Sequence, residues 1–556
     1  MRTAELHRLG LAGQYGLYSL AIIAGLTSSL TTLAQPIVVG LVISSMMEQN
    51  PYGGLVALLI SVFLVGMVVS VASQLALGRV SERYVMNLRN AIALKVMYAD
   101  WRSLHRYDKG DVISRVAVDT ALARGWLVGA VPQLTSAVLL VLGCAIGMAV
   151  ISLPLFLASF TCIAVFGGLS IFFSRGVKTA TVKNQEDTAV FIESLHRVIT
   201  NIVVLKTAVL EKIALGRVAD GSEMARRSGV RAIDRSALLG PTMNIGTQAA
   251  IALTVVLGGA LAATDTLSAA ALVTYFMYLL YIVAPLIGAA SAFGEIASSR
   301  AALQRLREIS DVPQELEGEK RVEKQCVSRL DLRDVGIEID GQPILDEISI
   351  VLSGPGLIAL TGPNGSGKST LLWTLNGLYR PDHGSINYNG LDINQISTTE
   401  LRKDICLIPQ NPAPLIGTVR DNLQTGESLI SDEDRWHALR TVGLENRVRS
   451  LPGGLSCALG EGGVELSGGQ RQLLALARGL LGDPSIFLLD EFTAYVDKEG
   501  EMALNSVAIE LAKTKLVVVV SHREEIVHMS DRILQLGEGR MVTTGSSGLS
   551  RSGPFK

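Results

Sequence analysis

The feature that most constrains the fold is a set of long charge-free runs in the first half of the chain. Each run lacks Asp, Glu, Lys and Arg. Each is also long enough to cross the hydrocarbon core of a bilayer, about 30 Å thick, which takes about 20 helical residues. The runs predict six transmembrane helices, the third and fourth joined by a tight turn. The predicted spans are Tyr15–Met46, Tyr52–Gly78, Trp126–Ile151, Ser152–Phe173, Ala237–Ala263 and Leu267–Gly294.

The segments between the spans predict how the helices are oriented. Arg79–Arg124 and Arg175–Arg235 are rich in Lys and Arg, whereas Ser44–Gly54, Ile151–Leu155 and Thr264–Ser268 contain neither. Because basic loops stay on the cytoplasmic side, we expect a multi-pass protein of the plasma membrane with both termini and its second half in the cytoplasm. The two basic segments are too long for turns, so they are expected to extend the helices into the cytosol.

The composition agrees with a chain that is part membrane domain and part water-soluble domain. Hydrophobic residues make up 49% and charged residues 18% of the 556 residues, and the formal net charge is −2. A nearly neutral chain gives no reason to expect nucleic acid as a partner. None of the five cysteines forms a Cys-x-x-Cys pair, which indicates a reducing cytosol around the second half. The N-terminal pattern does not predict a cleavable signal peptide.

The character of the chain changes beyond the last predicted span. Ser298–Val322 is charged and helical in pattern, which is typical of a helix that leaves the membrane and continues into a linker. From Cys326 onward, short apolar runs alternate with helical stretches and predict an α/β fold with a mostly parallel sheet. We therefore expect a transmembrane domain at 1–310, a linker at 311–325 and a second domain at 326–556. The expected strands include Ile348–Leu352, Gly356–Leu360, Ile486–Leu489 and Leu516–Val520.

A glycine-rich loop stands between one of these strand runs and a helical run, Leu371–Leu375. It matches the Walker A pattern, in which glycines let backbone N–H groups curl around phosphates at a helix N-terminus. We expect Lys368 to reach the β- and γ-phosphates and the Ser369 hydroxyl to ligate Mg²⁺. The predicted triphosphate site consists of Gly362, Pro363, Asn364, Gly365, Ser366, Gly367, Lys368, Ser369 and Thr370.

An acidic pair, Asp490 and Glu491, ends the apolar run that begins at Ile486. Downstream of a Walker A loop, such a pair predicts that Asp490 holds Mg²⁺. Glu491 is then placed to orient or deprotonate the attacking water. Together the two motifs predict nucleotide hydrolysis.

The most specific motif is Leu466-Ser467-Gly468-Gly469-Gln470. With it the chain resembles the ABC transporters, as an exporter-type half-transporter whose membrane domain precedes its ATPase domain. The resemblance covers nearly the whole chain. It implies a membrane α-helical bundle of six helices with long cytosolic extensions, followed by an α/β P-loop ABC ATPase domain. It also implies ATP and Mg²⁺ as ligands, and ATP hydrolysis coupled to transport.

The resemblance assigns further residues around the nucleotide. Gln410 matches the Q-loop glutamine, which contacts Mg²⁺ and water. His522 matches the switch histidine at the γ-phosphate, and Asp497 matches the D-loop aspartate. Gly460–Val464 resembles the exporter loop that touches the intracellular loops.

The signature implies that the working unit is a dimer. Ser467, Gly468, Gly469 and Gln470 precede a helical run, so they form a helix N-terminus suited to a γ-phosphate. In the family this element completes the ATP site of the opposite subunit, and ATP holds the two domains together. The basic segments then correspond to coupling loops. Gly110–Ala121 resembles the first coupling helix, and Glu193–Lys206 covers the second coupling region.

Two departures from the family pattern affect these expectations. Many relatives place an aromatic residue against adenine, but Asp334–Asp340 contains none, and Ile339 stands near that place. We expect a weaker adenine contact. The D-loop reads Ala494-Tyr495-Val496-Asp497 instead of the frequent Ser-Ala-Leu-Asp. Homodimer and heterodimer both stay open, and these irregularities slightly favour a heterodimer with a second half-transporter.

The predicted spans contain no ionisable side chain and few polar ones, such as Gln35, Gln133, Asn244 and Gln248. An amphiphilic substrate in the bilayer, such as a drug, lipid or peptide, fits this pattern better than an ion. The same glutamines also suit simple helix packing. The leading hypothesis is ATP-driven export by alternating access. The alternatives are an exporter-fold importer of a siderophore-like compound and an ABC-type regulator without transport.

Overall fold

The computed structural model describes residues 3–264, 266–315, 317–321, 327–415, 417–426, 429–460, 466–494, 496 and 498–546. They form two compact units. The helical unit comprises Met1–Leu94 with Gly110–Asp311, and the sheet unit comprises Lys95–Lys109 with Val312–Lys556. The domain boundaries expected from the sequence, with a transmembrane domain at 1–310, a linker at 311–325 and a second domain at 326–556, stay a prediction.

Within its described residues the helical unit provides six segments that are long and apolar enough to cross a membrane. They confirm the predicted six-helix bundle. The helices also extend beyond the charge-free runs, as expected; for example, the fourth predicted span ends at Phe173, and its helix continues to Thr200. The helices are α1 (Thr3–Gly10), α2 (Tyr15–Met47), α3 (Gly53–Met97), α5 (Lys109–Ser114), α6 (Thr120–Arg124), α7 (Val131–Ile151), α8 (Leu153–Thr200), α9 (Ile202–Thr207), α10 (Glu211–Ser236), α11 (Leu239–Ala263) and α12 (Ala269–Ser310).

Local sequence determines where these helices begin and where they are irregular. Ser152 is extended and Pro154 lies in the first turn of α8, where its missing N–H costs no hydrogen bond. This forms the tight turn predicted between the third and fourth spans. The third crossing segment also contains two π-helical stretches, η1 (Arg115–Asp119) and η2 (Gly125–Ala130). Such stretches are rare and occur frequently at functional sites.

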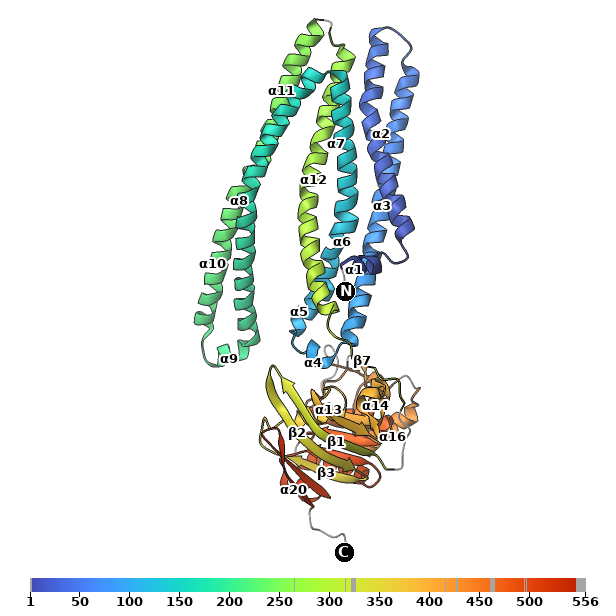
Figure 1. Cartoon of the computed structure of the whole chain (residues 1–556), viewed down its shortest axis with the longest axis vertical. Helices are drawn as coiled ribbons and strands as arrows, with labels where there is room; N and C mark the ends of the chain where they lie inside the picture. Colours follow the sequence, from blue (N-terminus) through green and yellow to red (C-terminus); the bar gives the residue numbers. More distant parts are fainter. Residues whose placement is uncertain are drawn as a thin grey trace. The chain divides into compact units, whose positions relative to one another are not determined.

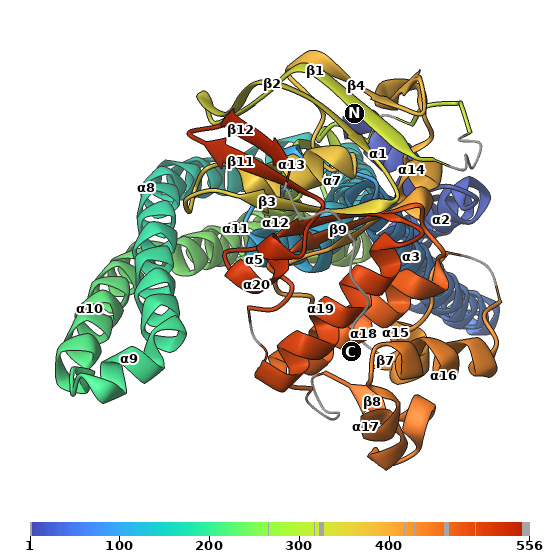
Figure 2. The same ribbon diagram turned by 90° about the horizontal axis from the view of Figure 1, so that it is seen from below.

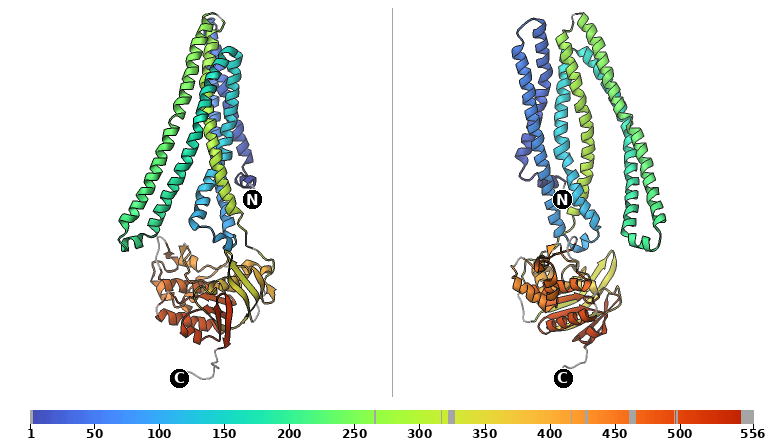
Figure 3. Two further views of the ribbon diagram at one scale, coloured as in Figure 1. Left: turned by 60° about the vertical axis from the view of Figure 1, so that its left-hand side comes forward. Right: turned by 180° about the vertical axis from the view of Figure 1, so that it is seen from behind.

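The helices of this unit pack in two groups. The helix α8 lies along α10 and α11, whereas α12 lies against α7 and α2 (Figure 1). The two views of Figure 3 show the α8–α10 hairpin diverging from the other helices toward α9. One of the polar residues expected in the spans serves packing, because the Tyr281 hydroxyl donates to Gln35 Oε1 at 2.8 Å.

The sheet unit contains a six-stranded sheet in the order β12-β11-β3-β10-β9-β6 and a four-stranded sheet in the order β2-β1-β4-β5. The neighbours from β11 to β6 are parallel, and the second sheet is antiparallel. The predicted strand runs all lie within strands. The strands are β1 (Arg329–Ile339), β2 (Gln342–Ser353), β3 (Gly356–Thr361), β4 (His383–Tyr388), β5 (Leu391–Asp392), β6 (Ile405–Ile408), β7 (Gly417–Thr418), β8 (Ala458–Leu459), β9 (Ile486–Asp490), β10 (Leu516–Val520), β11 (Arg532–Gly537) and β12 (Arg540–Ser546).

Apolar side chains are buried on both faces of the parallel sheet, as expected when helices cover both sides. Leu488 and Val518 join a core with α13 (Lys368–Leu375) and the second sheet. Their neighbours Phe487 and Val517 point the other way, into a core with α18 (Gly468–Leu481) and α19 (Lys498–Ala512). Figure 2 shows α13 on one side of this sheet and α18 and α19 on the other. The remaining helices of the unit are α4 (Trp101–Leu104), α14 (Thr398–Asp404), α15 (Val419–Asn422), α16 (Asp432–Thr441), α17 (Glu445–Ser450) and α20 (Glu524–His528).

Candidate functional site

The glycine-rich loop lies between the end of β3 and the start of α13, as predicted. Lys368 Nζ donates to the carbonyl oxygens of Gly362 at 2.9 Å and Pro363 at 2.8 Å, so the ammonium group lies inside the curl of the loop. Burial lowers the pKa of Lys368. Gly367 has a φ of +96°, and a Cβ there would lie 2.8 Å from the Ile344 carbonyl oxygen. Only glycine fits this position without strain.

The Ser369 hydroxyl faces the last residue of β9. Ser369 Oγ donates to Asp490 Oδ1 at 3.1 Å. Asp490 is only 3% exposed, and this burial raises the pKa of its carboxyl group. The hydroxyl of Ser366, in the same loop, is also buried and has no hydrogen-bond partner among the described residues. The loop thus presents oxygen atoms that are available to a ligand.

Two side chains from different parts of the chain meet at Glu491. Gln410 Nε2 donates to Glu491 Oε2 at 2.6 Å, and His522 Nε2 lies 3.8 Å from Glu491 Oε1. Gln410 follows β6, Glu491 follows β9 and His522 follows β10. Because these strands are parallel, their carboxyl ends share one edge, which is where open α/β sheets bind ligands. The structure therefore brings together Gln410, Glu491 and His522.

The signature residues lie at the N-terminus of α18. Ser467 Oγ accepts from the backbone N–H of Gln470 at 3.3 Å, and Gln470 Oε1 accepts from the Ser467 N–H at 3.1 Å. This reciprocal pair is a capping box. Ser467 is exposed. Among the described residues, no hydrogen bond joins Ser467–Gln470 to the glycine-rich loop of the same chain.

The sequence did not predict a role for Gln472, which connects the signature helix α18 to the segment around Gln410. Gln472 is almost fully buried in α18, and its Nε2 donates to the Gln410 carbonyl oxygen at 3.1 Å. The hydrogen bond ties the signature helix to the backbone of the Q-loop. The only available signal was its place two residues after the signature.

The coupling role expected of Gly110–Ala121 stays a prediction, and the residues just before it fall in the other unit. Gly110–Ala121 belongs to the helical unit, whereas Lys95–Lys109 belongs to the sheet unit. There the short helix α4 packs Trp101 against the sheet core, and Arg102 pairs with Asp382 at 2.8 Å. A helix this short, held by one aromatic side chain and one ion pair, leaves no periodic pattern in the sequence.

The second expected coupling region, Glu193–Lys206, covers the end of α8 and most of α9. Six large apolar side chains in it or just beyond it are between 60% and 81% exposed. Nothing within the described helical unit covers them, although they lie beyond the predicted membrane spans. These side chains are Ile199, Val203, Val204, Val209, Ile213 and Leu215.

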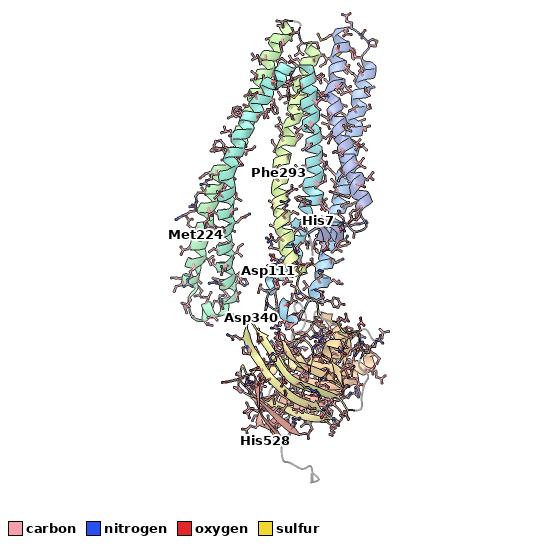
Figure 4. All side chains as sticks on the ribbon, viewed as in Figure 1. His7, Asp111, Met224, Phe293, Asp340 and His528 are labelled. Atoms are coloured by element: carbon pink, nitrogen blue, oxygen red, sulfur yellow. The ribbon has the colours of Figure 1, made fainter. Side chains whose placement is uncertain are left out.

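Two expected features lie partly or wholly outside the described residues. Asp497 and most of the loop at 460–464 are among the positions that the structure leaves undescribed. Ile339, near the expected adenine contact, ends β1 and packs partly buried against the core. Asp340, marked in Figure 4, follows with a φ of +51° and begins the turn.

Comparisons with known proteins agree with this geometry. The family model "ABC transporter transmembrane region" matches residues 18–286, and the model "ABC transporter" matches residues 345–494. A multidrug resistance ABC transporter ATP-binding and permease protein of Lactococcus lactis subsp. lactis is 29% identical over 96% of this chain and 90% of its own length. An ATP-dependent lipid A-core flippase of Thiobacillus denitrificans is 26% identical over 88% of this chain and 85% of its own.

A solved structure of a bacterial Atm1-family ABC exporter with ATP bound has the same fold. It aligns with a TM-score of 0.82 at 20% identity, over 96% of each chain. At this identity the likeness concerns the fold alone.

Proposed function

Because this chain belongs to the ABC transporters, as a half-transporter of exporter architecture that couples ATP hydrolysis to transport, we propose that it exports an amphiphilic compound by alternating access. It is a multi-pass membrane protein with a cytoplasmic ATPase. We further propose that both termini lie in the cytoplasm, following the Lys and Arg bias of the loops. The substrate class, drug, lipid or peptide, follows from the apolar character of the spans and from the named activities of the relatives.

The glycine-rich loop is the proposed holder of the ATP phosphates. Its backbone N–H groups, the N-terminus of α13 and the Lys368 ammonium would surround the β- and γ-phosphates. Lys368 already lies within the loop at Gly362 and Pro363, so binding needs only an exchange of carbonyl for phosphate oxygens.

The residues around Ser369 fit a magnesium ion. Mg²⁺ is usually held by one or two protein oxygens together with phosphates and water. Ser369 and Asp490 provide such oxygens, and Gln410 stands at the neighbouring carboxylate. When bound, the ion neutralises charge on the phosphates.

Glu491 is the proposed general base. Its two carboxylate oxygens face Gln410 and His522, so both neighbours can hold it in one orientation toward a water molecule. The convergence of these three side chains at one sheet edge is the observation that carries the proposal. His522 would contact the γ-phosphate from the same edge.

A second half-transporter is the proposed partner. Ser467, the N-cap of α18, is exposed, and among the described residues Ser467–Gln470 make no hydrogen bond to the glycine-rich loop of their own chain, as expected if they complete a partner's site. We propose that Ser467, Gly468, Gly469 and Gln470 bind ATP across a dimer, together with Asp497. The intact Glu491 and His522 allow a homodimer, while the changed D-loop keeps a heterodimer slightly favoured.

ATP hydrolysis by the purified full chain tests the catalytic assignment. Glu491→Gln should lower turnover by about 10²–10⁴-fold, the usual contribution of a general base, while ATP binding persists. Glu510→Gln is the matched control, since this acid is exposed on α19 and pairs only with Lys513 among the described residues. Turnover of Glu491→Gln equal to that of the control would refute the assignment.

A further inference from the structure

A cavity of about 620 Å³ lies within the helical unit, between α3, α12 and the third crossing segment. Four glycines help to form its walls: Gly78, Gly125, Gly129 and Gly294. Because glycine lacks a side chain, three neighbouring helices leave room here for a sizeable ligand. A pocket of this volume matches those that bind small organic molecules.

The cavity lies at the level where the apolar spans give way to charged residues. In α3 the charge-free run ends at Gly78, and in α12 it ends at Gly294. In the third segment, Arg124 stands two residues before the run that starts at Trp126. All three boundaries coincide at one cavity, whose lining combines apolar side chains such as Leu77 and Val128 with the charged Arg124 and Glu295. That combination suits an amphiphile, which has an apolar tail and a polar head group.

The charges around the cavity do not balance. Arg124 Nη1 donates to Glu82 Oε1 at 2.7 Å and to Ser81 Oγ at 3.1 Å, so its positive charge already has a carboxylate partner. Glu295 also lines the cavity, and no cation among the described residues lies within ion-pair distance of its carboxylate. One negative charge therefore remains for a ligand.

The Glu295 side chain is positioned by the π-helical stretch η2. A Cβ at Gly129 would overlap the Glu295 carboxylate, and one at Gly125 would lie 3.7 Å from Glu295 Cβ. The carboxylate thus rests against a bare stretch of backbone in a wide helical turn. Phe293, two residues earlier on α12 and marked in Figure 4, is 65% exposed and adds apolar surface at this level.

We infer that this cavity binds the cationic head group of an amphiphile and that Glu295 selects for positive charge. The inference rests on the proposed function and narrows its substrate class. An anionic head group would meet an uncompensated carboxylate, and a neutral one would gain no ion pair. The sequence pattern did not predict a role for Glu295, because the sixth charge-free run ends at Gly294, directly before it.

The test uses three dansyl-labelled dodecyl amphiphiles that differ only in a trimethylammonium, hydroxyl or sulfate head group. Their binding to the full-length protein in discs of neutral lipid is followed by fluorescence without nucleotide. The wild type should bind the ammonium probe about fivefold more tightly than the hydroxyl probe, the scale of a partly exposed ion pair. Glu295→Gln should abolish that preference, and Glu295→Lys should transfer it to the sulfate probe.

Two further variants separate charge selection from general damage. Glu308→Gln makes the same chemical change on the same helix but outside the cavity, so the ammonium preference should stay. Gly129→Ala keeps the charge but displaces the carboxylate, so the preference should fall. Equal affinity of the wild type for all three probes, or a preference unchanged in Glu295→Gln, would overturn the inference. ATP-driven transport of the hydroxyl probe would still support the proposed function in that case, whereas its absence for every probe would count against that function.

Discussion

The sheet unit buries its large apolar side chains on both faces of one sheet, whereas the helical unit leaves many of them exposed along its helices. Lipid covers such side chains on the membrane spans. It does not cover those around α9, beyond the predicted spans. The sheet unit therefore has the closed core of an independent domain, whereas the helical unit leaves apolar side chains uncovered around α9.

The polar groups of the two units differ in the same way. In the sheet unit, Asp490 and Glu491 each have a side-chain partner across the site. In the helical unit, Glu295 lines a cavity whose cation, Arg124, already pairs with Glu82, and among the described residues its carboxylate forms no ion pair. The partners of Asp490 and Glu491 fix the orientation of these carboxylates, whereas the carboxylate of Glu295 stays available to pair with a ligand.

The largest effect should come from removing the cation at the phosphates. Lys368→Ala should lower ATP hydrolysis by about 10²–10³-fold, because the lost ammonium stabilises charge that develops on the phosphates. Lys513→Ala, an exposed lysine of the same unit, is the control and should keep nearly full activity. Steady-state phosphate release measures both. Similar rates in the two variants would mean that the phosphates bind elsewhere.

A double substitution at α9 tests whether the helical unit needs a partner surface. Val203→Asp with Val204→Asp should reduce ATP-driven transport by about tenfold or more, because an interface that forms there would bury unpaired charge. Met224→Asp on α10, also exposed, should reduce it less than twofold. Transport into sealed vesicles is measured at equal protein levels. If all three substitutions are equally harmless, α9 faces solvent throughout the cycle.

The pH dependence of MgATP binding tests the buried carboxyl group of the sheet unit. Burial raises the pKa of Asp490, and only the ionised form holds Mg²⁺. Affinity should therefore rise with pH through that raised pKa, by up to about tenfold per pH unit, and level off above it. In Asp490→Asn this dependence should disappear. Titration calorimetry across acidic pH provides the measurement, and an equal slope in the variant would assign the proton to another group.

The smallest effect concerns adenine. Ile339→Tyr should tighten ATP binding by about threefold, because stacking of an aromatic ring adds roughly 1 kcal/mol or less. The neighbouring substitution Ile337→Tyr would not test this contact, because the Ile337 side chain is fully buried in the core. Competition against a fluorescent ATP analogue measures the change. Unaltered affinity would place the base away from the end of β1.

The parts of the site that could be predicted from the sequence are those whose residues form short motifs with fixed spacing. The loop around Lys368 and the acids after β9 carry their chemistry within a few residues, so the sequence predicts them directly. Gln472, α4 and Glu295 act through contacts with distant segments. Glu295 in particular gains its meaning from Gly129, which lies on another helix, and a scan for charge-free runs stops one residue short of it.

The central claim is that ATP hydrolysis in the sheet unit moves an amphiphile bound in the helical unit. Its most direct test is ATP-dependent accumulation of the trimethylammonium probe in inside-out vesicles. We predict accumulation with the wild type and none with Glu491→Gln. Accumulation that proceeds equally in Glu491→Gln, or ATP-driven movement only in right-side-out vesicles, would contradict it.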